Sequence, residues 1–352
     1  MLKPDHWIYQ NSAHVSTQAR KLATEHQAIL TKPPGSLGLL EDIAVDFAGW
    51  QNTAKPSLEN ISIRVFAADH GICQQGVSAF PQEVTSQMIL NFLSGGAAIS
   101  VLAKELKADF RVVNLGTVNT IEIDHHEQEK YTDAVIAKGT KDFTNQAAMT
   151  ESQLLKAFNS GAAEVCHTDL FIGGEMGIGN TTSASAIYSV LLNLSPTETV
   201  GPGTGIDQDT QAHKAQLIEK AISLHSPNIN TSLGILQCLG GFEIAALVGA
   251  YIKATQLGIP ILVDGFICTA AALLACKINP DARNWMLFSH QSGEPAHGFA
   301  LDYLSARPLL NLNMRLGEGS GAAIAASTIK NALNLHANMA TFTDAGVSDK
   351  DD

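Results

Sequence analysis

The sequence predicts an α/β fold, in which an open, mostly parallel sheet is flanked by helices and a small helical domain is built from both chain ends. Three observations indicate this class. Apolar runs of strand length recur, segments with helical spacing separate them, and each run ends in a glycine-rich or polar cluster. Strands that alternate with helices form parallel sheets with right-handed crossovers. Ligands bind beyond the carboxyl ends of such strands, which is where the polar clusters fall.

Five apolar runs are expected to form the strands. Their residues are mostly apolar and do not alternate strictly with polar ones, as in strands that are buried on both faces of a sheet. The runs span residues 61–68, 110–115, 170–172, 259–263 and 285–288. Between and around them, apolar residues at helical spacing predict helices over 84–106, 151–166, 181–194, 211–224 and 242–256.

The two ends of the chain have a different pattern. A polar helix precedes residue 30, and an alanine-rich helix is predicted over 321–339. We therefore expect a large α/β catalytic domain of residues 30–315. Residues 1–29 and 316–352 are expected to form the small, discontinuous helical domain.

Composition narrows the classes of function. The 34 acidic and 22 basic side chains give a net charge of −12 at pH 7, which lacks the basic surface of a nucleic-acid or anionic-membrane binder. The five cysteines are odd in number and form no C-x-x-C, so neither disulfides nor a zinc knuckle is expected. With no apolar leader and no long apolar run, we expect a cytoplasmic protein without a membrane span.

The densest cluster is GGEMGIGNTTSASA, over residues 173–186. Asn180 is predicted to be the N-cap of a helix, and Gly177 and Gly179 let backbone amides approach a ligand. These features predict an anion site at a helix N-terminus, or alternatively a tight turn without a ligand. The cluster GPGTGID, over residues 201–207, could add further amides or be a flexible connection. Lys214 could neutralise a phosphate or simply be solvated.

Two glutamates are candidates for acid–base chemistry. Glu318 lies between glycines in LGEGSGAAIA, before the alanine-rich helix, and Glu175 lies between glycine and methionine. A partly desolvated carboxylate has a raised pKa and suits a general base. The alternative is an acid at a helix start, which the helix dipole favours.

The histidines do not form a known metal motif. The segment SHQSGEPAH places His290, Glu294 and His297 close together, but the spacing differs from the zincin helix, so no metal is expected. Asp69 and His70 are either a hydrogen-bonded dyad or a structural pair at a strand end.

Taken in order, the clusters resemble one enzyme family over most of the chain. They are KPPGSLG, FAADHGI, GVSAFPQEVT, GGEMGIGNTT, GPGTGID, VDGF, SHQSGEP and LGEGSGAA. The sequence resembles the nicotinate-nucleotide–dimethylbenzimidazole phosphoribosyltransferases of cobalamin biosynthesis. The resemblance implies a Rossmann-like sheet and a homodimer with a shared active site. It implies transfer of phosphoribose from β-nicotinate mononucleotide to 5,6-dimethylbenzimidazole, with inversion, and no cofactor.

The resemblance also implies roles for individual residues. The general base falls on Glu318. The pocket for the benzimidazole falls on Phe80, Gln87, Met176 and Leu316, where Phe80 brings no hydroxyl group. The phosphate and ribose would contact Gly177, Gly179, Asn180, Gly203, Lys214 and Ser292, and Glu175 would line the same cavity.

Two other classes of function stay open on the residues alone. A Rossmann-like oxidoreductase fits the parallel sheet, although no G-x-G-x-x-G occurs. A non-catalytic nucleotide-binding module is the third hypothesis.

Overall fold

Within the described residues, seven parallel strands form one sheet in the order β3-β2-β1-β4-β5-β6-β7. The computed structural model describes the chain except residues 1–2, 4, 202–204, 206 and 349–352. The strands are β1 Ile61–Ala68, β2 Asp109–Gly116, β3 Tyr131–Asp133, β4 Leu170–Met176, β5 Ile261–Val263, β6 Met286–His290 and β7 Pro308–Leu310. The predicted fold class is therefore confirmed.

The strands differ from the predicted ones at the sheet edges and in β4. All five predicted strands are present, but β3 and β7 were not predicted, because each has three residues, all of them partly exposed or exposed, at a sheet edge. Strand β4 continues through Gly173 and Gly174 to Met176, whereas the glycines suggested a turn. Neither position has room for a side chain, because a Cβ atom would lie 2.5 Å from Leu247 Cδ2 at Gly173 and would overlap the carbonyl oxygen of Glu318 at Gly174.

Helices cover both faces of the sheet and fill two apolar cores. Along β1, Phe66 and Ala68 face the core beneath α5, α6, α10 and α11, while Ile63, Val65 and Ala67 face the core beneath α2, α3, α4 and α13. The helices are α1 Thr17–Ile29, α2 Leu39–Gln51, α3 Glu83–Ser94, α4 Ala98–Leu106, α5 Glu151–Ala163, α6 Asn180–Leu192, α7 Pro196–Thr199, α8 Gln208–His225, α9 Ser232–Leu239, α10 Phe242–Gln256, α11 Phe266–Ile278, α12 Pro295–Tyr303, α13 Ser320–Asn338 and α14 Phe342–Ala345.

The prediction of one helix over 84–106 was wrong. The structure divides this segment into α3 and α4, because Gly95 ends α3 in a left-handed conformation with φ 87°. The whole segment Glu83–Leu106 is long and apolar enough to cross a membrane by length and composition. Its two helices have 12 and 9 residues, however, and a membrane span needs about 20. This segment is therefore better explained as two helices packed against one face of the sheet than as a membrane span.

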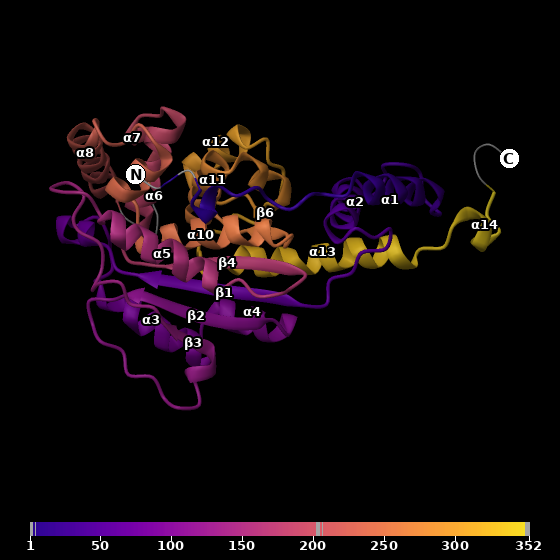
Figure 1. Cartoon of the computed structure of the whole chain (residues 1–352), viewed down its shortest axis with the longest axis horizontal. Helices are drawn as coiled ribbons and strands as arrows, with labels where there is room; N and C mark the ends of the chain where they lie inside the picture. The colour runs from indigo at the N-terminus through magenta and orange to yellow at the C-terminus, as the bar shows by residue number, and fades with distance from the viewer. Residues whose placement is uncertain (1–2, 4, 202–204, 206, 349–352) are drawn as a thin grey trace.

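Helices α1, α2 and α14 lie with the C-terminal part of α13 at one end of the molecule (Figure 1), whereas Trp7, before α1, reaches Asn159 of α5. Helix α13 runs from beside the sheet to α1 and α2. Leu30 pairs with Thr341, and the imidazoles of His26 and His336 are in edge-to-face contact. The division into two domains stays a prediction, since α13 also packs on β4, β5 and β6.

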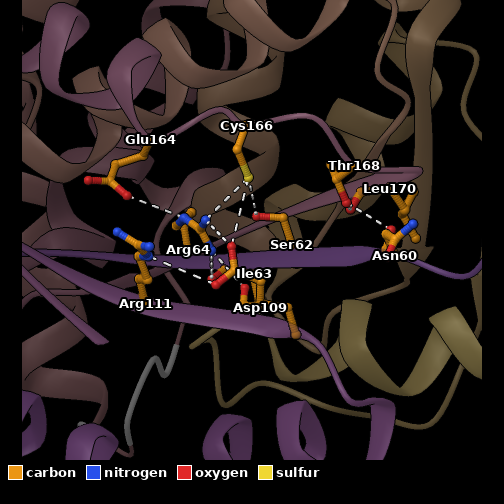
Figure 2. A network of polar contacts seen from close by, with 10 residues as sticks. All are labelled: Asn60, Ser62, Ile63, Arg64, Asp109, Arg111, Glu164, Cys166, Thr168 and Leu170. Carbon is orange, nitrogen blue, oxygen red and sulfur yellow. Dashed lines mark hydrogen bonds and ion pairs between the residues drawn. The ribbon is translucent and has the colours of Figure 1, made fainter. Parts of the chain in front are cut away.

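A network of charged side chains lies near the amino-terminal ends of the strands (Figure 2). Arg64 of β1 is buried, and its Nη2 donates to Asp109 Oδ2 at 2.6 Å, while its Nε lies 3.3 Å from Glu164 Oε2. A buried guanidinium is tolerated when carboxylates and carbonyls satisfy it. This network lies at the starts of β2 and β4, whereas ligands are expected at the opposite end of the sheet.

Candidate active site

A cavity of about 360 Å³ opens at the carboxyl ends of β4, β5 and β6. Glu175 and Met176 end β4, Asp264 follows β5, and His290 ends β6. One wall comes from α3 and the residues before it and is apolar, formed by Phe80, Val84 and Met88. The cavity therefore has the position expected for a ligand site in a parallel α/β sheet.

The structure brings most of the predicted residues to this cavity. Those that line it are Phe80, Glu175, Met176, Gly177, Asn180, Ser292, Leu316 and Glu318. Gly179 and Lys214 lie behind the lining, and Gly203 lies outside the described residues. Gln87 is exposed and does not line the cavity. Val84 and Met88, which lie one turn apart from each other on α3, line it instead.

Glu318 is held in the cavity wall by an unusual backbone. Gly317, Glu318 and Gly319 have φ values of 88°, 65° and 87°, so all three are left-handed. This conformation costs a non-glycine residue about 1–2 kcal/mol, and the surroundings must hold it in place. Asp264 does so, because its carboxylate accepts the amide hydrogens of Gly319 at 3.2 Å and Ala322 at 2.8 Å.

The carboxylate of Glu318 is largely desolvated. The side chain is buried, and its Oε2 accepts a long hydrogen bond of 3.4 Å from the amide of Ile99, in the first turn of α4. Burial raises the pKa of Glu318, the amide of Ile99 lowers it, and the charge of Asp264 raises it further. The net increase moves this carboxylate toward the range of a general base.

The pKa of Glu175 is raised more strongly than that of Glu318. Burial, followed by the charges of Glu243 and Asp264, raises its pKa to about 8, so the group is mostly protonated at pH 7. Asn180 Nδ2 donates a short hydrogen bond to Glu175 Oε2. The prediction of Asn180 as N-cap was wrong: Gly179, with φ 97°, is the N-cap of α6, and Asn180 is its first residue.

The two glycines before α6 allow close packing at the cavity edge. A side chain at Gly177 would overlap the carbonyl of Ala68 and contact the ring of His70. At Gly179 a Cβ atom would lie 2.7 Å from Cys73 Sγ. His70 itself is fully buried, and its Nε2 lies 2.6 Å from Glu243 Oε1. Of the two alternatives for Asp69 and His70, a dyad between neighbours is not what forms, since His70 pairs with Glu243 on α10.

Lys214 is not a solvated surface lysine. Its side chain is buried, and its Nζ donates to Thr181 Oγ1 at 2.7 Å. Burial lowers its pKa to about 8, although the nearby charge of Glu294 acts in the opposite direction. Thr181 lines the cavity, so the ammonium group lies one side chain behind the lining, near the first turn of α6. Together they form an electropositive region suited to an anion.

The comparisons with known proteins decide the family. A phosphoribosyltransferase family model matches residues 13–347. A nicotinate-nucleotide–dimethylbenzimidazole phosphoribosyltransferase of Xanthomonas oryzae is 51% identical over 348 residues, 97% of this chain and 99% of the relative. One of Pseudomonas putida is 50% identical, with 98% of each chain covered. The crystal structure of CobT from Thermus thermophilus superposes with a TM-score of 0.88 at 38% identity, covering 94% of this chain and 99% of that one.

The chain belongs to the nicotinate-nucleotide–dimethylbenzimidazole phosphoribosyltransferase family. The predicted resemblance and the predicted enzyme class, a phosphoribosyltransferase, are confirmed. Within the part of the chain that the structure describes, no three His, Cys, Asp or Glu side chains come together as a metal site requires.

Several residues of this phosphoribosyltransferase site were not predicted. Asp264 was only part of the motif VDGF, yet it fixes the Glu318 loop. Met88 and Val84 contribute to the apolar wall without any motif that marks them. His290 lines the cavity, with its Nδ1 3.9 Å from Asp264 Oδ1. An acidic residue directly after an apolar strand is the sequence signal that could have found Asp264.

We expect this enzyme to lose stability in acid through its buried histidines. Burial lowers the pKa of His297 to about 3 and also lowers the pKa of His336. Below about pH 6.5 the unfolded chain binds a proton at His297, and the folded chain does not until about pH 3. The contribution of His297 to stability is therefore complete above pH 6.5 and falls toward pH 3, by at most about 1.4 kcal/mol per pH unit, and His336 contributes in the same direction. Urea unfolding of the wild type and His297→Asn across this range measures the contribution of His297, and parallel pH dependences would contradict it.

Proposed function

We propose that this enzyme transfers the phosphoribosyl group of β-nicotinate mononucleotide to 5,6-dimethylbenzimidazole. The products would be α-ribazole 5′-phosphate and nicotinate, in the lower-ligand branch of cobalamin biosynthesis. The observation that carries the proposal is the buried Glu318, held in a cavity with one apolar wall and one electropositive end. A flat apolar base fits between Phe80, Met88 and Met176, and a phosphate suits the region of α6 and Lys214.

The chemistry needs one base and one leaving group. Glu318 accepts the N–H proton of the benzimidazole as the other ring nitrogen attacks C1 of the ribose. The bond from C1 to the nicotinate nitrogen breaks, and its electron pair neutralises the cationic pyridine ring. Because attack comes from the face opposite to nicotinate, the β configuration becomes α.

Glu175 has a different role in this proposal. With a pKa of about 8 it is mostly neutral at pH 7, and it lies beside Asn180 at the first turn of α6. Two carboxyl groups with separated pKa values in one cavity divide acid and base roles between them. Glu318 is the proton acceptor, and Glu175 is a hydrogen-bonding group that keeps its own proton.

Replacement of Glu175 with glutamine is expected to preserve most of the activity at pH 7. Glutamine imitates the protonated carboxyl group and can still accept the hydrogen bond from Asn180 Nδ2. Glu175→Ala removes this acceptor and is expected to reduce activity by about tenfold or more. Initial rates of the two variants, measured side by side, test the assignment. A glutamine variant as poor as the alanine variant would show that Glu175 acts through its charge.

We further propose a homodimer in which the partner subunit covers the mouth of the cavity. Phe80 and Leu316 line the cavity and are apolar, but they are 48% and 58% exposed in the single chain. Apolar side chains clustered at a site mark a surface that another protein can cover. A cytoplasmic location stays a prediction.

The test of the proposed function is a direct assay. The protein is incubated with nicotinate mononucleotide and dimethylbenzimidazole, and nicotinate is followed by chromatography. Nicotinate release that requires the base is expected. Folded protein that releases no nicotinate in response to the base would contradict the proposal.

A further inference from the structure

His297, in the first turn of α12, lies beneath the loop that joins β6 to α12, and it has no role of its own in the chemistry above. Successive amides of this loop point in opposite directions. Gln291 and Gly293 donate their amide hydrogens to the carbonyls of Leu310 and Met314 on one side. Ser292 donates its amide hydrogen on the other side, to Nδ1 of His297 at 2.8 Å.

The partners of the His297 ring define its tautomer. A backbone amide can only donate, so Nδ1 carries no hydrogen and Nε2 carries the proton. Nε2 lies 2.9 Å from Thr269 Oγ1 on α11, which can accept that proton in a hydrogen bond. The ring is fully buried, and the imidazole of His290 lies beside it, with the two ring centroids 6.4 Å apart. A neutral ring with a fixed tautomer is a rigid acceptor for Ser292.

The loop that His297 holds borders the end of the cavity where Lys214 and the first turn of α6 lie. Ser292 and Glu294 both line the cavity, and Ser292 Oγ accepts the amide hydrogen of Glu294 at 3.3 Å. Glu294 is close enough to Lys214 to affect its pKa, and a side chain at Gly201 would overlap the Glu294 carboxylate. The loop therefore lies on the side of Lys214 and away from the apolar wall of Phe80 and Met88.

We propose that His297 is a positioning residue for the phosphoribosyl donor. In its Nε2–H tautomer, the His297 ring accepts a hydrogen bond from the Ser292 amide at Nδ1. This bond fixes the cavity wall of Ser292 and Glu294, which would contact nicotinate mononucleotide. This inference rests on the proposed function. Without the acceptor, the buried amide of Ser292 has no partner and the loop must shift to satisfy it.

Two substitutions distinguish the role of Nδ1 from the role of Nε2 in the His297 ring. In His297→Asn, the side-chain oxygen takes the place of Nδ1, keeps the acceptor for Ser292 and loses Thr269. In His297→Gln, the amide takes the place of Nε2, keeps Thr269 and leaves Ser292 without an acceptor. We expect His297→Gln to weaken binding of nicotinate mononucleotide by about tenfold and His297→Asn to restore most of it. The KM for dimethylbenzimidazole should be unchanged in both.

A matched control measures the effect of replacing a buried histidine that is not at the cavity. His225 on α8 is also buried, and its Nε2 donates to the carbonyl of Phe143, outside the cavity lining. His225→Gln should leave the affinity for nicotinate mononucleotide unchanged. Thr269→Val is a second test: it removes the partner of Nε2 but leaves Nδ1 as the acceptor for Ser292, so it should weaken binding of the same ligand much less than His297→Gln.

The measurements are calorimetric binding of nicotinate mononucleotide, thermal unfolding, and ¹⁵N NMR of the histidine rings. We expect one ring in the wild type to show the neutral Nε2–H signature from pH 5 to 8 and to disappear in His297→Asn. Equal affinities of the wild type and folded His297→Gln, or equal losses in His297→Gln and His297→Asn, would overturn the inference. A wild type that binds the donor but releases no nicotinate would contradict the proposed function instead.

Discussion

Glu318→Gln is expected to lower base-dependent nicotinate release by at least about 100-fold while the protein stays folded. Glutamine has nearly the same shape but cannot accept the proton of the benzimidazole, and a general base contributes about 10²–10⁴-fold to the rate. The carboxylate is buried and makes one long hydrogen bond, to the amide of Ile99, so the neutral side chain should not destabilise the loop. Initial rates and thermal unfolding of the variant measure both effects.

Glu175→Gln is the matched control for this variant. Both glutamates line the same cavity, and both substitutions remove one potential negative charge. A large loss at position 318 together with a small loss at position 175 would assign the base. A Glu318→Gln variant with a rate near that of the wild type would show that another group accepts the proton.

Gly174→Ala is expected to reduce activity by about 100-fold or more without any change in a polar group. Gly174 lies inside β4, and a Cβ atom there would overlap the carbonyl of Glu318 and lie 2.9 Å from the amide nitrogen of Gly319. Both obstacles are backbone atoms of the loop that presents the base, so the loop must move. A displacement of about 1 Å at a reacting group costs on the order of 10²-fold in rate.

Gly298→Ala is the control for the added methyl group. Gly298 is in α12, where the nearest atom to a new Cβ is Gln291 Nε2 at 3.9 Å. We expect this variant to keep its activity and to be as stable as the wild type or slightly more stable, because alanine favours a helix. If Gly174→Ala were as active as Gly298→Ala, the close contact of β4 with the Glu318 loop would not be needed for catalysis.

The sheet could be predicted from the sequence where its strands are buried on both faces. Strand β1 is apolar or fully enclosed at every position, and its predicted bounds match the structure. The edge strands β3 and β7 could not be predicted, since three residues carry no period and pairing with a neighbour decides their conformation. Helix α11 is apolar on all sides and therefore shows no helical period, although it is fully helical in the core.

The site was predictable where glycines mark it and less so elsewhere. Glu318 stands out between two glycines, and the structure explains both by the left-handed backbone of the loop. The burial of Lys214 and the pairing of His70 with Glu243 depend on packing between distant helices and strands, which no local pattern encodes. Likewise, whether Gln87 or Met88 faces the cavity depends on the rotation of α3, and one residue of rotation changes the answer.

A crystal structure of the enzyme with dimethylbenzimidazole bound tests the central claim most directly. We expect the base to lie in the cavity against Phe80, Met88 and Met176, with a ring nitrogen at about 2.6–3.2 Å from a carboxylate oxygen of Glu318. A base bound in this cavity with its nitrogens directed away from Glu318, or a base bound elsewhere on the protein, would contradict the account.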